Sequence, residues 1–142
     1  MIEIVSGTRT LRISPFEREN VPDAPPYDRI TTFVEYQLPE LKTQYQATFL
    51  VGELIDLKES LRGLHTSLIN NNAHSGIVFD STENQLNMHF LPVSSGSAVG
   101  LELILRPENP AESVVVTDYF GIDESYFPAL VAGLDEMINW RN

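Results

Sequence analysis

Five leucines recur at spacings of three, four, three and four residues, and this repeat constrains the fold of the 142-residue chain more than any other feature. A period close to 3.6 residues places them on one stripe of a helix. The sequence therefore predicts an amphipathic helix over about residues 53–69. Gly63 lies inside it, and because an interior glycine costs a helix about 1 kcal/mol relative to alanine, we expect close packing at that turn. The leucines are Leu54, Leu57, Leu61, Leu64 and Leu68.

A second apolar stripe predicts a helix over about residues 124–140. Asp123 or Ser125 could cap its first turn, and Pro128 is compatible with a helix only because it lies near the start. The stripe consists of Phe127, Leu130, Val131, Leu134 and Ile138, with Met137 beside it.

The other patterned segments alternate apolar and polar residues or are rich in β-branched and aromatic residues, as strands are. Short connections between them favour an antiparallel meander. We therefore expect one α+β domain over residues 1–142, in which a curved, mainly antiparallel sheet of about six to eight strands packs against both helices. Residues 15–29, with four prolines, are expected to form a surface loop. The clearest strand candidates are residues 30–38, 43–51, 76–80, 85–91, 99–106 and 113–120, with two weaker ones within residues 1–14.

The charge of the chain is strongly acidic and unevenly spread. Nine Lys and Arg residues stand against 20 Asp and Glu residues, which gives a formal net charge of −11. Residues 1–62 hold 7 basic and 10 acidic residues, whereas residues 63–142 hold 2 basic and 10 acidic residues. This acidity serves either solubility or the attraction of a basic partner. It argues against nucleic acid as a partner, because phosphates repel an acidic surface.

Cysteine is absent, which excludes disulfides, thiolate metal sites and a cysteine nucleophile. No apolar stretch approaches the ~20 residues of a membrane span. The first residues lack the pattern of a secretory signal. We therefore expect a cytoplasmic protein without membrane contact.

Catalytic motifs are scarce. The sequence contains no nucleophile elbow, phosphate-binding glycine loop, dinucleotide fingerprint or H-E-x-x-H motif. His65 is expected in an ordinary position beside the first helical stripe. A metal site of His74, His89 and Asp80 is conceivable but lacks the tight spacing of known ligand motifs. We expect no catalytic residue, no metal site and no cofactor.

Acidic and aromatic residues crowd the end of the chain. Asp123 and Glu124 suit the start of a helix, and Asp118 is expected to be an exposed strand residue. Tyr119 and Phe120 are adjacent in a predicted strand, so they point to opposite faces and one of them is expected at the surface. Aromatic anchors dominate the binding energy of protein interfaces. The candidate partner-binding residues are therefore Asp118, Tyr119, Asp123, Glu124 and Tyr126.

The order of these patterns is familiar from one protein family. The leucine-striped helix is followed by the acidic Glu83, the strands at 86–90, 100–103 and 114–120, and the helix start Asp123-Glu124-Ser125-Tyr126-Phe127. This order resembles the WapI-like immunity proteins of bacterial contact-dependent toxin systems over about residues 45–140. The resemblance implies a small cytoplasmic protein without catalysis of its own, which binds and neutralises a cognate toxin domain, often a nuclease.

Our main hypothesis is thus an acidic binding protein whose partner is a basic toxin domain. Two alternatives stay open at this stage. Small acidic chaperones of bacterial secretion share the size, acidity and α+β composition, but they begin with a helix. A metal-dependent hydrolase would rely on Asp118 and Asp123 with His89. The sequence does not predict the oligomeric state.

Overall fold

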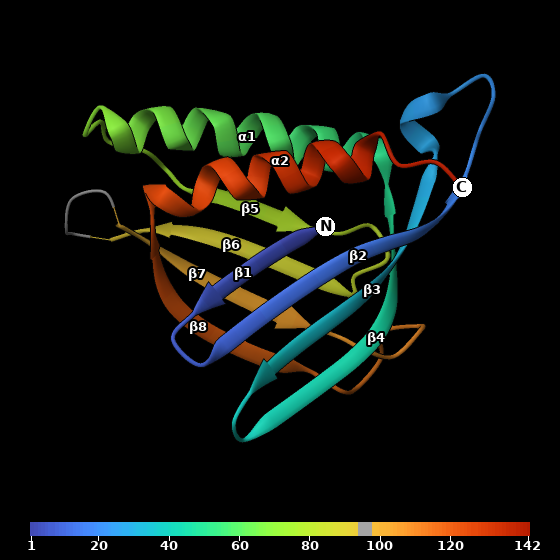
Figure 1. Ribbon diagram of the computed structural model, residues 1–142, viewed down its shortest axis with the longest axis horizontal. Coiled ribbons are helices and arrows are strands. Elements are labelled where there is room, and N and C mark those ends of the chain that lie inside the picture. The colour runs from blue at the N-terminus through green and yellow to red at the C-terminus, as the bar shows by residue number, and fades with distance from the viewer. Residues whose placement is uncertain (94–97) are drawn as a thin grey trace.

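Two four-stranded antiparallel sheets, each followed in the chain by one helix, make up the structure. The computed structural model describes residues 1–93 and 98–142. Figure 1 shows the two sheets facing each other, with both helices side by side along one border of the pair. Each sheet is a meander of consecutive strands, as the short connections predicted. The α+β class is confirmed, although the single curved sheet we expected is divided into two.

Sheet A has the strand order β1-β2-β3-β4. A turn at Gly7, whose φ is +59°, joins the first two strands, and the left-handed conformation suits glycine. The pairing between β2 and β3 shifts between Pro15 and Glu17, where a bulge interrupts the register. The strands are β1 (Ile2–Ser6), β2 (Arg9–Glu19), β3 (Arg29–Leu38) and β4 (Leu41–Leu50).

Sheet B repeats this arrangement with the order β5-β6-β7-β8. Its strands fall close to the segments with apolar alternation, except that β8 begins three residues later than the predicted strand at 113–120. The strands are β5 (Ile77–Asp80), β6 (Leu86–Pro92), β7 (Ala98–Leu105) and β8 (Val116–Asp123).

The helices pack against each other over the sheets and bury the two predicted stripes. Helix α1 (Val51–Ile69) buries all five leucines of the repeat. The last helix begins as a short 3-10 turn, η2 (Glu124–Tyr126), and continues as α2 (Phe127–Ile138). Phe127 is fully buried and its ring lies 5.7 Å from that of His65 in α1, centroid to centroid. His65 therefore has the ordinary packing role that we expected. None of the helices in residues 1–93 and 98–142 is long and apolar enough to span a membrane.

The connection between β2 and β3 is shorter than the predicted loop at 15–29, because β2 continues to Glu19. It contains one 3-10 turn, η1 (Pro25–Tyr27). Asp28 at its end is buried and accepts hydrogen bonds from the Val21 amide at 2.6 Å and from the guanidinium of Arg18 at 2.8 Å. These hydrogen bonds lower the pKa of Asp28 below its ordinary value of 3.8, and the bond from the Val21 amide has the largest effect.

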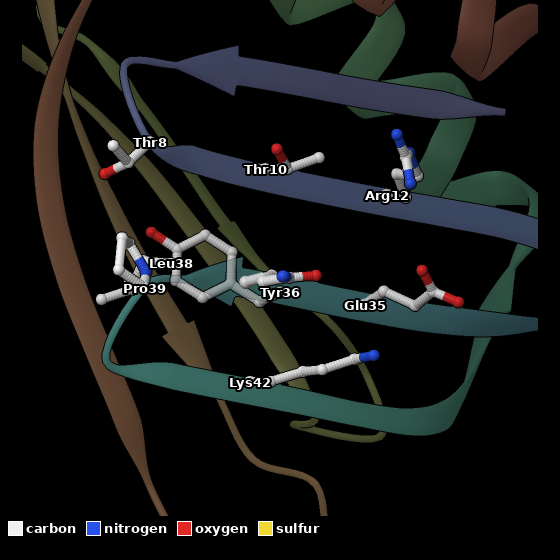
Figure 2. A pocket seen from close by; sticks show the side chains of 9 residues that line it. Thr8, Thr10, Arg12, Glu35, Tyr36, Leu38, Pro39 and Lys42 are labelled. Atoms are coloured by element: carbon white, nitrogen blue, oxygen red, sulfur yellow. The ribbon is translucent and has the colours of Figure 1, made fainter.

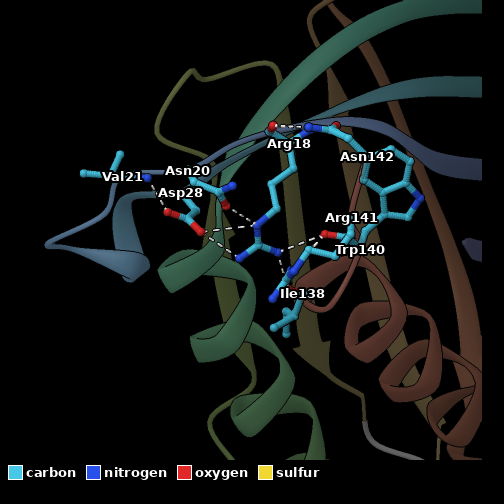
Figure 3. A network of polar contacts seen from close by, with 8 residues as sticks. All are labelled: Arg18, Asn20, Val21, Asp28, Ile138, Trp140, Arg141 and Asn142. Carbon is cyan, nitrogen blue, oxygen red and sulfur yellow. Dashed lines mark hydrogen bonds and ion pairs between the residues drawn. The ribbon is translucent and has the colours of Figure 1, made fainter.

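Arg18 ties the other end of the chain to this loop (Figure 3). Its Nη1 donates to the carbonyl oxygens of Ile138 at 2.7 Å and Trp140 at 3.1 Å, just where α2 ends. The backbone amide and carbonyl of Arg18 also pair with the side-chain amide of Asn142, at 2.8 and 2.9 Å. A buried cation at a helix C-terminus satisfies carbonyl groups that have no partner within the helix. The fold is thus closed by contacts between its first sheet and its last residues.

Candidate protein-docking face

The strands of sheet B carry acidic and apolar side chains on their outer face, and Arg106, which follows β7, reaches this face and donates to the side chain of Asn87. None of the four strands of this sheet contains a basic residue other than His89, whereas the strands of sheet A contain Arg9, Arg12, Arg18, Arg29 and Lys42. Strand register places four side chains in one row across the sheet, from the edge strand β5 to the edge strand β8. The row consists of Val78, His89, Glu102 and Tyr119. We call the sheet B face the surface formed by Val78, Asp80, His89, Leu91, Glu102, Tyr119 and Asp123.

Tyr119 is the most prominent aromatic residue of the sheet B face, and 53% of it is exposed. Its ring lies over Gly100 in the neighbouring strand, so closely that a Cβ added at Gly100 would meet the Tyr119 Oη at 2.1 Å. Gly100 pairs with Gly121, so two adjacent strands lack side chains beside the ring. The missing side chain at Gly100 therefore leaves room for the tyrosine ring against the sheet.

His89 lies in the middle of the row between two carboxylates. Its Nε2 is 2.8 Å from Asp80 Oδ1, and its Nδ1 is 2.9 Å from Glu102 Oε1. The hydrogen bond to Asp80 raises the pKa of His89 above its ordinary value of 6.5, with a smaller contribution from Glu102. The same contact with His89 lowers the pKa of Asp80. The centre of the face is thus an ordered acid–imidazole–acid arrangement.

Asp118 does not belong to this face, contrary to the expectation of an exposed strand residue. It points between the two sheets, where its carboxylate accepts from Arg9 Nε at 2.6 Å and from the hydroxyl of Tyr36. Burial opposes ionisation of Asp118, but the hydrogen bonds from Arg9 and Tyr36 outweigh it and lower the pKa. The Arg9 guanidinium in turn lies 5.5 Å from the centre of the Phe120 ring. Asp118 therefore joins sheet B to sheet A.

The other three candidate residues lie where β8 leads into the last helix. Asp123 is exposed and caps η2, with its Oδ1 3.0 Å from the amide nitrogen of Ser125. Glu124 and Tyr126 are half-buried in η2, and the Tyr126 hydroxyl donates to the Val5 carbonyl of β1 at 3.1 Å. Tyr119 and Asp123 thus share the sheet B face, while Tyr126 is engaged with sheet A.

The arrangement needed for the hydrolase alternative is not formed. Asp118 pairs with Leu103 on the inner face, whereas His89 lies on the outer face with Glu102. His74, in the connection after α1, accepts a hydrogen bond from the Gly76 amide at 3.1 Å. Within residues 1–93 and 98–142, no group of three or more histidine and carboxylate side chains is placed to hold a metal ion.

The outer face of sheet A offers a second candidate surface. A hollow of about 270 Å³ lies beside the turns of its two hairpins, and Figure 2 shows its side chains extending from neighbouring strands. Arg12 and Lys42 line it together with Glu35. Arg12 also pairs with Glu3 at 2.6 Å. Because charges of both signs alternate here, this surface is less suited to a basic partner than the sheet B face.

Sequence reasoning missed Glu102 as the cross-strand neighbour of Tyr119. Successive side chains in a strand point to opposite faces of the sheet. This alternation alone was sufficient to predict that Glu102 lies on the outer face, because its neighbours Leu101 and Leu103 are buried on the inner face. Only the register of three strand pairs, however, brings Val78, His89, Glu102 and Tyr119 into one row.

A family model matches nearly the whole chain. The model describes the WapI-like immunity proteins and covers residues 1–141. The chain belongs to the WapI-like immunity protein family. The family match includes the first 44 residues, which the resemblance seen in the sequence did not cover. Membership implies a cognate toxin as partner, and it favours neither the chaperone nor the hydrolase alternative. Comparison with curated proteins gives no match.

Solved structures similar to this immunity protein include two from Arabidopsis thaliana, WHY3 and WHY1. WHY3 has a TM-score of 0.47 and 12% identity, with 96% of this chain and 84% of that chain covered. WHY1 has a TM-score of 0.45 and 12% identity, with 97% and 84% covered.

Proposed function

We propose that this immunity protein neutralises a basic toxin domain by binding it with the sheet B face. The observation that carries the proposal, together with family membership, is the absence of Lys and Arg from all four strands of a sheet that exposes Asp80 and Asp123 and carries the half-buried Glu102 beside them. A domain that grips phosphate, as a nuclease does, is basic where it binds. An acidic face therefore complements such a surface and accelerates its capture.

Tyr119 is the expected anchor of this contact. Tyrosine is enriched among interface residues that carry most of the binding energy, because it buries a large area and loses little conformational freedom. The ring is already held against Gly100, so binding need not immobilise it. Inhibition then results from occupation of the toxin surface, and no covalent chemistry by this chain is required. We expect this to take place in the cytoplasm.

The test uses the purified toxin domain encoded beside the gene for this chain. Binding is measured by calorimetry at low and high salt, and we expect the affinity to fall as ionic strength rises. Tyr119→Ala should weaken binding at least tenfold, which corresponds to about 1.4 kcal/mol. Tyr27→Ala is the matched control, because Tyr27 is a 62% exposed tyrosine in η1, away from the sheet B face.

Loss of a single charge on the face provides a second comparison. Glu102→Gln should slow association, while Glu35→Gln, which removes the same charge from the outer face of sheet A, should leave it unchanged. Equal effects of the two tyrosine variants, or affinity indifferent to salt, would contradict the proposed docking face. Absence of any binding would contradict the toxin-neutralising function itself.

A further inference from the structure

Strand β5 is a free edge of sheet B. It pairs with β6 on one side, and the strand order places no other described strand on its second side. The Ser81 amide donates to the Leu86 carbonyl at 3.1 Å, directly after the strand. Because antiparallel residues alternate between bonded and non-bonded pairs, Ile77 and Phe79 bond to β6. The backbone groups of Val78 and Asp80 therefore point to the open side, where they form a template for another strand.

A groove runs along this edge between β5 and helix α1. It consists of two hollows of about 160 and 440 Å³ that share Ser60, Ile77 and Val78. All four residues of β5 line the first hollow, and residues 73–78 line the second. On the helix side, Gly63 lies in the second hollow, and a Cβ built there would have no atom within 4 Å. There is thus unfilled space beside backbone groups that are available for pairing.

The negative charge of the groove favours a basic binding partner. Its charged lining residues are Glu53, Asp56 and Asp80, and no lysine or arginine is among the lining residues. Val78, which is 67% exposed, adds an apolar surface at the same place. The edge also continues the sheet B face, because Val78 is the last member of the row that begins at Tyr119.

We propose that the toxin domain adds an extended, basic segment to the free edge of β5 as a fifth strand of sheet B, seated in the groove beside α1. This inference rests on the proposed function and specifies how the partner is held. Main-chain hydrogen bonds to Val78 and Asp80 provide affinity, and basic side chains of the segment meet the acidic lining. A second copy of this chain is disfavoured as occupant, because each copy carries a net charge of −11.

The test compares two tyrosines added to α1. Gly63→Tyr fills the groove, whereas Thr66→Tyr adds the same bulk at an exposed position of the same helix that does not line the groove. With the purified toxin domain, we expect Gly63→Tyr to weaken binding at least tenfold and Thr66→Tyr to change it less than twofold. Circular dichroism should show that both variants are folded. Hydrogen exchange of the unmodified chain gives an independent measurement, in which toxin binding should slow exchange of the Val78 and Asp80 amides.

Four results would overturn the strand addition. If toxin binds Gly63→Tyr as tightly as the unmodified chain, or leaves exchange at residues 77–80 unchanged, this contact is wrong and the docking function stands. If light scattering shows a dimer that Gly63→Tyr dissociates, the occupant is a second copy. If the unmodified chain does not bind the toxin, both this inference and the proposed function fail.

Discussion

Arg18 and Asp28 form an ion pair with 2.8 Å between Nη2 and Oδ2, and both side chains are at least 93% buried. The pair lies between β2 and the loop before β3, while the same guanidinium holds the carbonyl of Ile138 at the end of α2. One residue of the first sheet thus fixes both a proline-containing loop and the last helix.

Arg18→Met should therefore destabilise the fold strongly. Removal of one partner of a buried pair leaves an uncompensated charge and costs about 3–5 kcal/mol, and we expect the free energy of unfolding in urea to fall by that amount. Arg12→Met is the control, because Arg12 pairs with Glu3 at the exposed surface, where such pairs contribute little. If the free energy of unfolding falls by a similar amount in both variants, the buried pair does not stabilise the fold more than the exposed pair does.

Asp118 should affect stability more than toxin binding. Its pKa is lowered in the folded protein, so its contribution is fully present above the ordinary value of 3.8 and is lost as the pH falls through the folded value. We expect Asp118→Asn to reduce the free energy of unfolding by roughly 1.5 kcal/mol at neutral pH. Below about pH 4, the free energy of unfolding of this variant should also change less with pH than that of the unmodified chain. Unchanged stability together with weakened toxin binding would instead place Asp118 in the interface.

His89 should stabilise the sheet B face most at acidic pH. Its pKa is raised on folding, so its contribution is complete below the ordinary value of 6.5 and is lost as the pH rises through the folded value. The unmodified chain should lose about 0.5–1 kcal/mol more than His89→Gln across this range, as partly exposed pairs do. NMR titration of the imidazole gives the pKa directly. A midpoint at or below 6.5 would contradict this prediction.

Local patterns predicted the elements of this fold well. The leucine repeat defined α1 because its period identifies a buried helical face in any context. The division into two sheets was missed, since alternation within a strand is the same in one sheet or two. The inward position of Asp118 could have been found, because it shares a period of two with the buried Phe120 and Ile122. Burial of Arg18 could not, because its helix-end partners lie 120 and 122 residues further along the chain.

The roles of two helical glycines were also beyond local reasoning. The close packing expected at Gly63 is wrong, because nothing lies within 4 Å of a Cβ built there. Gly133 in α2 is the tightly packed one, since a Cβ at this position would lie 2.5 Å from the carbonyl oxygen of Met1. Both glycines lie within helices, so helix propensity alone predicts the same destabilisation relative to alanine at the two positions.

Alanine at the two positions should consequently have opposite effects. Gly63→Ala should raise the free energy of unfolding by about 1 kcal/mol, because it improves helix propensity without a clash. Gly133→Ala should lower it by about 1–3 kcal/mol, because β1 must move away from α2 to admit the methyl group. Urea denaturation of both variants checks the pair. Stabilisation by both would mean that the contact between Met1 and α2 yields freely, and the close approach of the first strand to the last helix would then contribute nothing to the fold.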